Sequence, residues 1–190
     1  LICDMSSDIF SRNINVKDFD LIYAGAQKNM GPAGATLVIV KKDSLPLKHN
    51  LPTYLDYNTH IKKDSMFNTP PVFSIYVSML NLKWIQKHGG ISAMEKKNEQ
   101  KSKTIYNEID RNPLFTGIVN QEDRSIMNAT FKLENESLKN QFEKMCEDAG
   151  INGIHGHRSI GGYRASMYNA LELESVNTLI EIMKTLEKNA

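Results

Sequence analysis

The chain opens with three short runs of apolar residues that are separated by glycine and polar residues. The runs cover residues 1–3, 21–24 and 35–40. Each run is almost continuously apolar and does not alternate with polar positions, which is typical of strands covered on both faces in an α/β sheet. The pattern therefore predicts three strands of an α/β domain at the start of the chain.

A helical pattern follows these strands. Apolar side chains recur at steps of four, three and four residues, which predicts a helix with one inward face. This face consists of Phe73, Val77, Leu80 and Trp84. We expect the helix to start within residues 68–71, Asn-Thr-Pro-Pro, because Asn or Thr can cap its first turn and proline is tolerated there. The glycine pair at 89–90 should end it.

Beyond residue 90 the pattern changes. Residues 91–109 are polar and rich in lysine, which predicts a solvated helix at the start of a second domain. The segments after it predict the order strand, helix, strand, strand, helix, which makes a small α+β layer. These segments are residues 124–133, 134–149, 151–157, 163–168 and 172–188. We therefore predict two domains, over residues 1–90 and 91–190.

Composition narrows the class of protein. The 190 residues are 41% hydrophobic and 24% charged, which is ordinary for a globular protein and too apolar for a disordered one. Lys and Arg number 23 and Asp and Glu number 22, a net charge of +1, which argues against a basic nucleic-acid binder. Any anionic ligand must therefore be held by a local cluster of donors.

Three further features bear on where the protein works. Cys3 and Cys146 cannot form a disulfide framework, which favours a reducing, cytoplasmic compartment. No apolar run is long enough to cross a bilayer, so we expect no membrane partner. The chain begins at Leu1 inside an apparent strand, and we expect it to be a fragment that lacks an N-terminal part.

Lys28 lies in a loop of small residues, 25–34, between the second and third predicted strands. A neutral lysine condenses with an aldehyde, and glycine and alanine let a flat ligand approach the backbone. The loop is not a Walker A motif, because Gln27 precedes the lysine and Asn29 follows it. Taken alone, a solvated loop lysine remains the alternative.

Two other positions in the first domain can carry chemistry. Asp4 ends the first predicted strand, which is where α/β sheets place their ligands, and an ionised carboxylate can pair with a protonated ring nitrogen. Asn68 and Thr69 lie at the predicted helix start, where free N–H groups and the helix dipole favour a phosphate. A strand-end aspartate and a plain helix cap are the alternatives.

The second domain contains a cationic segment at residues 155–166. Arg158 and Arg164 flank a double glycine, and His155 and His157 precede them. Guanidinium groups bind carboxylate and phosphate through paired, charge-assisted hydrogen bonds. No cysteine or carboxylate stands at ligand spacing from the histidines, so we predict no metal site. A basic surface turn is the alternative.

Taken in order, these motifs resemble the phosphoserine aminotransferases, which are class V aminotransferases of the pyridoxal-phosphate (PLP) fold type I. The resemblance rests on Asp4, YAGAQKNMGPAG at 23–34, SMFNTPP at 65–71, GHR at 156–158, GGYRAS at 161–166 and YNA at 168–170. It implies an α/β fold, namely the C-terminal part of an aspartate-aminotransferase-like large domain followed by a small α+β C-terminal domain. It covers only the C-terminal half of such an enzyme.

The resemblance also implies roles for the residues that match. Lys28 would hold PLP covalently and move the substrate's α-proton, and Asp4 would keep the pyridine nitrogen protonated. Gln27 would contact the cofactor phosphate. Asn68 and Thr69 would contact it across a homodimer with a shared active site.

Three matching residues lie in the second domain and would bind substrate. Arg164 would clamp the substrate α-carboxylate. His157 and Arg158 would meet the phosphate of phosphoserine or the side-chain carboxylate of glutamate. No metal and no nucleic acid is implied.

The implied reaction transfers the amino group of L-glutamate to 3-phosphohydroxypyruvate, in serine biosynthesis and also in vitamin B6 biosynthesis on a related substrate. Other parts of the site would lie in the missing N-terminal half, so we expect this piece alone to be inactive. Two alternatives stay open. One is another PLP fold type I enzyme, of the cysteine desulfurase or alanine–glyoxylate aminotransferase type, and the other is a non-catalytic phosphate-binding module.

Overall fold

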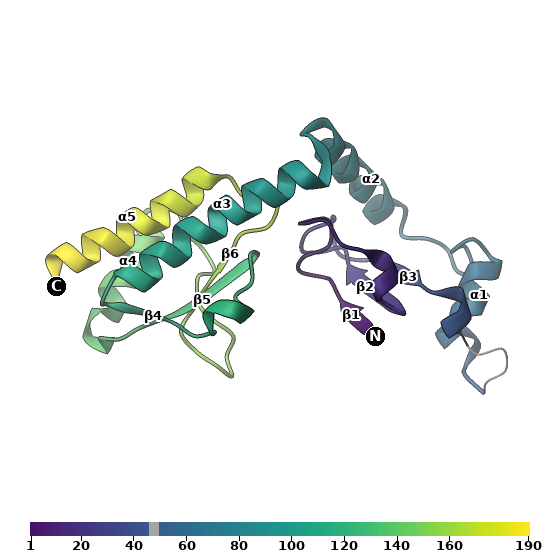
Figure 1. Ribbon diagram of the computed structural model, residues 1–190, viewed down its shortest axis with the longest axis horizontal. Coiled ribbons are helices and arrows are strands. Elements are labelled where there is room, and N and C mark those ends of the chain that lie inside the picture. The colour runs from purple at the N-terminus through teal and green to yellow at the C-terminus, as the bar shows by residue number, and fades with distance from the viewer. Residues whose placement is uncertain (46–49) are drawn as a thin grey trace. The chain divides into compact units, whose positions relative to one another are not determined.

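The computed structural model describes residues 1–45 and 50–190 and divides the chain into two units. Unit 1 is Leu1–Ser92 and unit 2 is Ala93–Ala190 (Figure 1). The helix α3, Gly90–Arg111, runs through the division. The assignment of the units as the large and small domains stays a prediction.

Unit 1 contains a three-stranded sheet in the order β1-β2-β3. The strands are β1 (Ile2–Asp4), β2 (Leu21–Gly25) and β3 (Thr36–Val40), which confirms the three strands predicted from the apolar runs. β1 runs parallel to β2, and β3 runs antiparallel to β2. Because β1 and β2 are parallel, their carboxyl ends meet at one edge of the sheet.

The helix α2, Val72–Lys87, starts later than the sequence predicts. Pro71 is its N-cap residue and no side chain caps it, so Asn68 and Thr69 lie outside the helix. The physical reason is that a residue followed by proline is pushed out of the helical region, which applies to Thr69 and to Pro70. The cap predicted at residues 68–69 is therefore wrong.

The predicted inward face of α2 is also wrong. Phe73 is 73% exposed and Leu80 is 43% exposed, whereas Ser74 and Ser78 are buried. The small side chains face a loop that comes very close, since a Cβ on Gly31 would lie 2.4 Å from Ser78 Oγ. The helical spacing identifies the helix, but the approach of the loop decides which face is covered.

The remaining elements of unit 1 are short. One of them is the helix α1, Tyr57–Lys62, which begins after Asp56, whose side chain accepts a hydrogen bond from the Asn58 backbone N–H at 2.8 Å. The unit also holds 3₁₀ turns at Val16–Asp18, Lys42–Ser44 and Thr53–Leu55.

Unit 2 packs three helices with an antiparallel sheet in the order β4-β5-β6 (Figure 1). The sheet strands are β4 (Phe115–Gly117), β5 (Asn128–Leu133) and β6 (Tyr163–Ser166). The helices are α3, α4 (Lys139–Asp148) and α5 (Leu173–Asn189), and 3₁₀ turns lie at Gln121–Asp123 and Glu136–Leu138. The α+β composition predicted for this part of the chain is confirmed.

One predicted strand of unit 2 does not form. Residues 151–157 make a single isolated bridge, between His155 and Tyr163. Gly153 has a φ of 70°, in the left-handed region, which interrupts an extended strand. The segment still lies against β6, because the Arg164 N–H donates to the Ile154 carbonyl at 2.6 Å.

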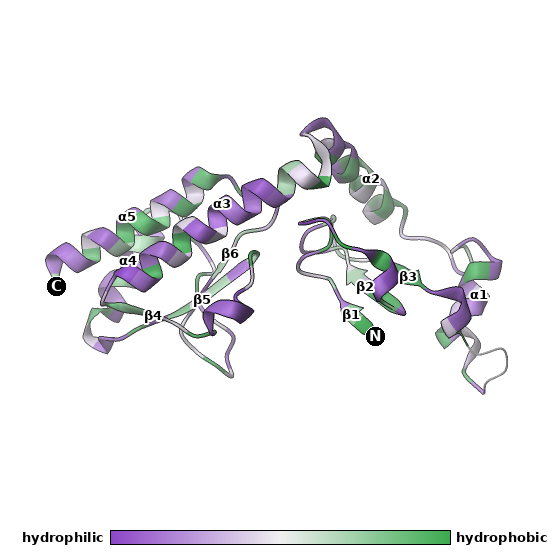
Figure 2. Cartoon of the chain, in the orientation of Figure 1, coloured by the Kyte–Doolittle hydropathy of each residue, from purple (hydrophilic) through white to green (hydrophobic). Residues whose placement is uncertain are grey.

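The core of unit 2 is aromatic. Phe115, Phe131, Phe142 and Tyr163 are buried, with ring centroids 4.9–6.4 Å apart. Such pairs add to the free energy gained by burying their area. Figure 2 shows apolar positions along the helices around this core, alternating with polar ones.

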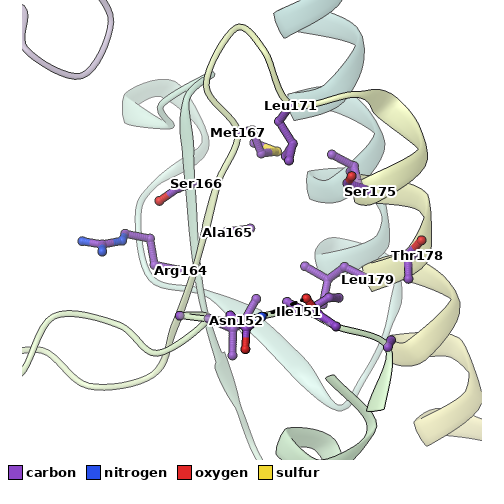
Figure 3. Close-up of a pocket in the computed structure, with 15 residues that line it drawn as sticks. Ile151, Asn152, Arg164, Ala165, Ser166, Met167, Leu171, Ser175, Thr178 and Leu179 are labelled. Carbon is purple, nitrogen blue, oxygen red and sulfur yellow. Dashed lines mark hydrogen bonds between the residues drawn. The ribbon is translucent and has the colours of Figure 1, made fainter. Parts of the chain in front are cut away.

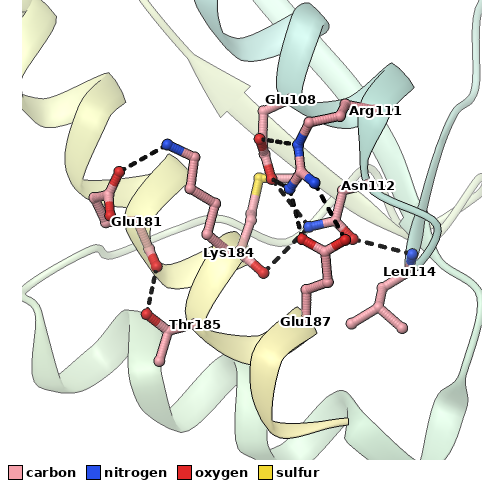
Figure 4. A network of polar contacts seen from close by, with 9 residues as sticks. Glu108, Arg111, Asn112, Leu114, Glu181, Lys184, Thr185 and Glu187 are labelled. Atoms are coloured by element: carbon pink, nitrogen blue, oxygen red, sulfur yellow. Dashed lines mark hydrogen bonds and ion pairs between the residues drawn. The ribbon is translucent and has the colours of Figure 1, made fainter.

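Polar contacts complete the packing of α3 against α5 (Figure 4). Arg111 bonds to Glu108 at 2.7 Å and to Glu187 at 2.6 Å, and Asn112 Nδ2 donates to Glu108 at 3.0 Å. Burial opposes the charge of Glu108, but the hydrogen bonds from Arg111 and Asn112 keep the pKa of this carboxyl below its ordinary value. The network therefore ties the end of α3 to the last helix.

A fully buried lysine lies on α3. Lys101 Nζ donates to the carbonyls of Met167, Tyr168 and Leu171 at 3.0, 2.9 and 3.0 Å. Burial lowers the pKa of Lys101 to about 8, while the charge of Glu172 opposes that shift. The ammonium thus holds the turn that follows β6.

None of the helices in the described ranges is long and apolar enough to cross a membrane.

Candidate active site

The site in unit 1 starts at the carboxyl end of β1, with Asp4. This side chain is exposed, and its Oδ1 accepts hydrogen bonds from the Ser6 hydroxyl at 2.6 Å and from the Ser6 N–H at 2.8 Å. The Ser6 hydroxyl and then the Ser6 N–H lower the pKa of Asp4, and Tyr23 and Lys28 act in the same direction. The carboxylate is therefore held in its ionised form.

Lys28 lies just beyond the carboxyl end of the neighbouring strand. Asp4 pairs with Tyr23 in the parallel register, β2 ends at Gly25, and the turn that follows carries Lys28 into solvent. The charge of Lys28 is close enough to lower the pKa of Asp4. The structure thus brings these two predicted site residues to one edge of the sheet.

Gln27 lies on the same turn and is exposed. Its side-chain amide lies over Gly25, where a Cβ would be only 2.6 Å from Gln27 Oε1. Any residue larger than glycine at position 25 would displace Gln27, so the glycine in this loop sets the direction of the Gln27 amide.

The turn that carries Lys28 is fastened on two sides by residues that the sequence prediction missed. The buried Asn29 Nδ2 donates to the Ile9 carbonyl at 2.6 Å. From α2, Asn81 Nδ2 donates to the carbonyls of Asn29 and Met30 at 3.2 and 2.9 Å, and Ser74 Oγ donates to the Ala33 carbonyl at 2.6 Å. The spacing of Ser74, Ser78 and Asn81 on one helix face was the available signal.

Asn68 and Thr69 are exposed. Asn68 Nδ2 donates to the Thr69 carbonyl at 3.2 Å, and Asn68 lines a cavity of about 570 Å³ that β3 also lines. Within the described part of unit 1, no hydrogen bond or ion pair joins this segment to Asp4 or Lys28. Asn68 and Thr69, which the sequence predicts to contact the cofactor phosphate, are therefore not bonded to Asp4 or Lys28 of the same chain.

The remaining predicted residues belong to unit 2. Arg164 lies on β6 opposite Thr130, is exposed, and borders a cavity of about 310 Å³ between β6, the segment 149–154 and α5. Figure 3 shows its guanidinium pointing away from that cavity. The cavity is therefore not the place where Arg164 would meet a ligand.

His157 and Arg158 occupy the exposed tip of a loop over residues 156–162. The base of the loop is closed by the Gly156 N–H, which donates to the Gly162 carbonyl at 2.8 Å. A Cβ on Gly156 would lie 2.1 Å from the Gly161 carbonyl oxygen, and one on Gly162 would lie 2.7 Å from the Phe131 carbonyl oxygen. Glycine at these positions lets the loop fold tightly against the sheet.

The arginines of the chain fall into two groups. Arg12, Arg111 and Arg124 each form an ion pair with a carboxylate. Arg158 and Arg164 form none within residues 1–45 and 50–190. Because guanidinium groups bind carboxylate and phosphate strongly, two exposed arginines without an acidic neighbour are available to an anionic ligand.

The sequence matches the family described as "Aminotransferase class-V" over residues 1–179. It is 61% identical to the phosphoserine aminotransferase of Flavobacterium psychrophilum, over 98% of this chain and 53% of that protein. The chain spans about half the length of the curated relatives it matches.

Solved structures agree with the sequence matches. The phosphoserine aminotransferase from Bacillus circulans subsp. alkalophilus has a TM-score of 0.93 at 44% identity, over 99% of this chain and 53% of that one. The PLP-bound phosphoserine aminotransferase from Trichomonas vaginalis has a TM-score of 0.89 at 41% identity, over 96% of this chain and 53% of that one. These likenesses bear out the expected aspartate-aminotransferase-like fold.

Proposed function

This chain belongs to the aminotransferase class-V family, and we propose that it is the C-terminal half of a PLP-dependent phosphoserine aminotransferase. The reaction moves the amino group of L-glutamate to 3-phosphohydroxypyruvate and yields 2-oxoglutarate and O-phospho-L-serine. The names of the curated relatives support this activity. The observation that carries the substrate class is the pair of exposed arginines without acidic neighbours.

The residues in unit 1 fit PLP. A carboxylate held ionised by Ser6 lies at the same sheet edge as an exposed lysine, at the carboxyl ends of two parallel strands. When bound, PLP supplies an aldehyde for a lysine amine and a protonated ring that withdraws electrons from the substrate α-carbon. Asp4 would pair with the ring nitrogen, Lys28 would hold the aldehyde end, and Gln27 would contact the phosphate.

The chemistry assigned to this chain is proton transfer and orientation. Lys28 Nζ would take the α-proton of the amino acid and later return it to a carbon of the cofactor. Asp4, as a carboxylate, would keep the ring nitrogen protonated throughout. Both tasks need an exposed amine and an ionised acid, and both groups have that state in the structure.

The substrate residues divide by ligand group. Arg164 would bind the α-carboxylate that every amino-acid substrate carries. His157 and Arg158 would bind the phosphate of phosphoserine or the side-chain carboxylate of glutamate. Their loop is exposed and free of acidic contacts, which supports an anionic ligand.

The whole protein is proposed as a cytoplasmic homodimer in which the N-terminal half completes the site. Asn68 and Thr69 are both exposed, which supports a contact of each with the cofactor phosphate of a neighbouring subunit. Cys3 and Cys146 are free thiols, which supports a reducing compartment. A related phosphorylated 2-oxo acid of vitamin B6 biosynthesis offers the same phosphate and carboxylate.

Borohydride reduction tests the cofactor assignment. The full-length protein is incubated with PLP, reduced and mapped by peptide mass spectrometry. We expect a pyridoxyl mass on the Lys28 peptide and none on the peptide that carries Lys41 and Lys42, which are also exposed. Scattered labelling would contradict the assignment and favour a non-catalytic phosphate-binding module.

Kinetics with two arginine variants tests the substrate class. In the full-length enzyme, Arg158→Ala should raise KM for phosphoserine by about tenfold or more and leave KM for alanine unchanged, because one charge-assisted contact is lost. Arg164→Ala should raise KM for both. Equal effects of Arg158→Ala on the two substrates would sink the phosphate role and favour an enzyme of the cysteine desulfurase or alanine–glyoxylate type.

A further inference from the structure

Ser6 connects two parts of the site in unit 1 through a single hydroxyl. Ser6 Oγ donates to Asp4 Oδ1 at 2.6 Å and accepts from the Gly25 N–H at 3.0 Å. A serine hydroxyl has one donor and two acceptor positions, so it can make both bonds at once. Asp4 ends β1, and Gly25 ends β2 and begins the turn that carries Lys28.

The bonds to Ser6 leave the two carboxylate oxygens of Asp4 unequal. Oδ1 accepts both the hydroxyl and the backbone N–H of Ser6, and these bonds fix the rotation of the carboxylate. Oδ2 is outside that pair of bonds. The Tyr23 hydroxyl also interacts with this carboxylate, but Tyr23 lies on β2 itself and does not reach across to Gly25 as Ser6 does.

The backbone around Ser6 is held independently of its side chain. The Met5 N–H donates to the Tyr23 carbonyl at 2.8 Å, and the Ile9 N–H donates to the Met5 carbonyl at 2.8 Å. Loss of the hydroxyl would therefore leave Asp4 Oδ1 with only the Ser6 N–H bond and would free the Gly25 N–H, without unfolding the turn.

We propose that Ser6 is a positioning residue, whose hydroxyl ties the Asp4 carboxylate to the start of the Lys28 turn and fixes the orientation in which that carboxylate would meet the ring nitrogen of the bound cofactor. This inference rests on the proposed function for the identity of that ligand. This hydrogen-bonded link fixes the position of the Asp4 carboxylate relative to the turn that carries Lys28, so that both side chains can contact one small ring.

The test uses three variants of the full-length enzyme. Ser6→Ala removes the hydroxyl, and Ser6→Thr keeps it. Ser7→Ala is the matched control, because Ser7 is the half-buried neighbour and its hydroxyl makes no hydrogen bond in the described part of the chain. Thermal unfolding of each variant checks that the fold is retained.

The first readout needs no cofactor. Carbon-13 NMR of the Asp4 carboxyl in the apoenzyme should show its pKa rising toward the ordinary value in Ser6→Ala, since the principal hydrogen bond that lowers it is gone. Ser7→Ala should match the wild type, and Ser6→Thr should restore the low value. An Asp4 pKa that does not respond to Ser6→Ala would overturn the inference.

The second readout uses the loaded enzyme. Ser6→Ala should shift the pH dependence of the visible absorption of bound PLP and lower kcat by about tenfold, the loss expected for one hydrogen bond to a charged group. KM for glutamate should change by less than about twofold, because Ser6 does not touch substrate. A spectrum and kcat equal to those of Ser7→Ala, or a Ser6→Thr enzyme as impaired as Ser6→Ala, would overturn the role.

The two proposals fail differently. A wild-type enzyme that is not labelled at Lys28 by PLP and borohydride would overturn the proposed function. An enzyme that is labelled there, but in which Asp4 and kcat do not respond to Ser6, would overturn this inference alone.

Discussion

Units 1 and 2 differ in how much of their apolar surface is buried within the unit itself. The core of unit 2 is built on Phe115, Phe131, Phe142 and Tyr163, all buried. The core of unit 1 is a smaller cluster around Met5, Ile9, Ile22, Ala24, Ala26 and Met30. Among the described residues, nearly all large exposed apolar side chains belong to unit 1, and many lie on α2, where Figure 2 shows them in green.

This difference predicts that unit 2, which carries Arg158 and Arg164, folds on its own, and that unit 1, which carries Asp4 and Lys28, does not. The arginines project from a unit that has its own core. Lys28 and Asp4 lie on a unit that leaves Val72, Phe73 and Tyr76 in water. Apolar patches of this kind mark surfaces that contact other protein, which agrees with the proposed N-terminal half and second subunit.

The largest effect on folding is expected when the two units are produced as separate chains. Residues 90–190, which keep α3 whole, should unfold cooperatively in urea with a free energy of unfolding of about 5 kcal/mol. Residues 1–92 alone should show no cooperative transition and should bind a dye for exposed apolar surface. Circular dichroism and dye fluorescence measure the two properties. A cooperative transition in residues 1–92 would contradict the conclusion that unit 1 does not fold on its own.

Truncating one phenylalanine in each unit sharpens the comparison. Phe131→Ala should lower the free energy of unfolding by about 3–5 kcal/mol, because Phe131 is 0% exposed and its removal leaves a cavity. Phe73→Ala should change it by less than about 0.5 kcal/mol in this chain, because Phe73 is 73% exposed. Urea unfolding followed by circular dichroism compares the two. Similar losses would mean that α2 is covered within the chain.

Replacing Lys101 should have a smaller effect on the free energy of unfolding, and that effect should depend on pH. Lys101→Met should lower the free energy of unfolding by about 2 kcal/mol at pH 7, since three carbonyls lose their donor. The pKa of Lys101 is about 8 in the folded chain and 10.5 when unfolded, so between these values the unfolded chain holds a proton that the folded chain has lost.

The stability of the wild type should therefore rise relative to Lys101→Met as the pH increases from about 8 to 10.5. Urea unfolding of residues 90–190 at several pH values measures the difference. Glu172 and Lys97 also act on this ammonium, and neither is changed in the comparison. A constant difference across the window would mean that the ammonium keeps its charge in the folded chain.

Much of the fold follows from the sequence because the local signals are strong. Continuous apolar runs predicted the three strands of unit 1, helical spacing predicted α2, and the helices α4 and α5 lie within segments that the sequence also predicts to be helical. The inward face of α2 could not be predicted, because it depends on a glycine loop that approaches from elsewhere in the chain. The strand expected at residues 151–157 failed at Gly153, whose left-handed conformation the apolar pattern does not reveal.

The site divides in the same way. Asp4 and Lys28 could be picked from strand ends and a small-residue loop, and their roles stay predictions. Ser6, Asn29 and Asn81 were missed because their importance lies in hydrogen bonds to backbone groups distant in sequence. Serine and asparagine are common in loops, so Ser6 and Asn29 carry little signal, whereas Asn81 lies on α2 and could be found only from its spacing with Ser74 and Ser78.

The glycine base of the 156–162 loop has a consequence for how the sequence of this loop can change over evolutionary time. At its base, Gly156 lies against the Gly161 carbonyl and Gly162 against the Phe131 carbonyl, with no room for a side chain, whereas His157 and Arg158 at its tip are exposed. Replacing residues at the tip would cost little stability, whereas replacing Gly156 or Gly162 would destabilise the loop. The sequence of the tip can therefore vary while the base of the loop keeps its glycines.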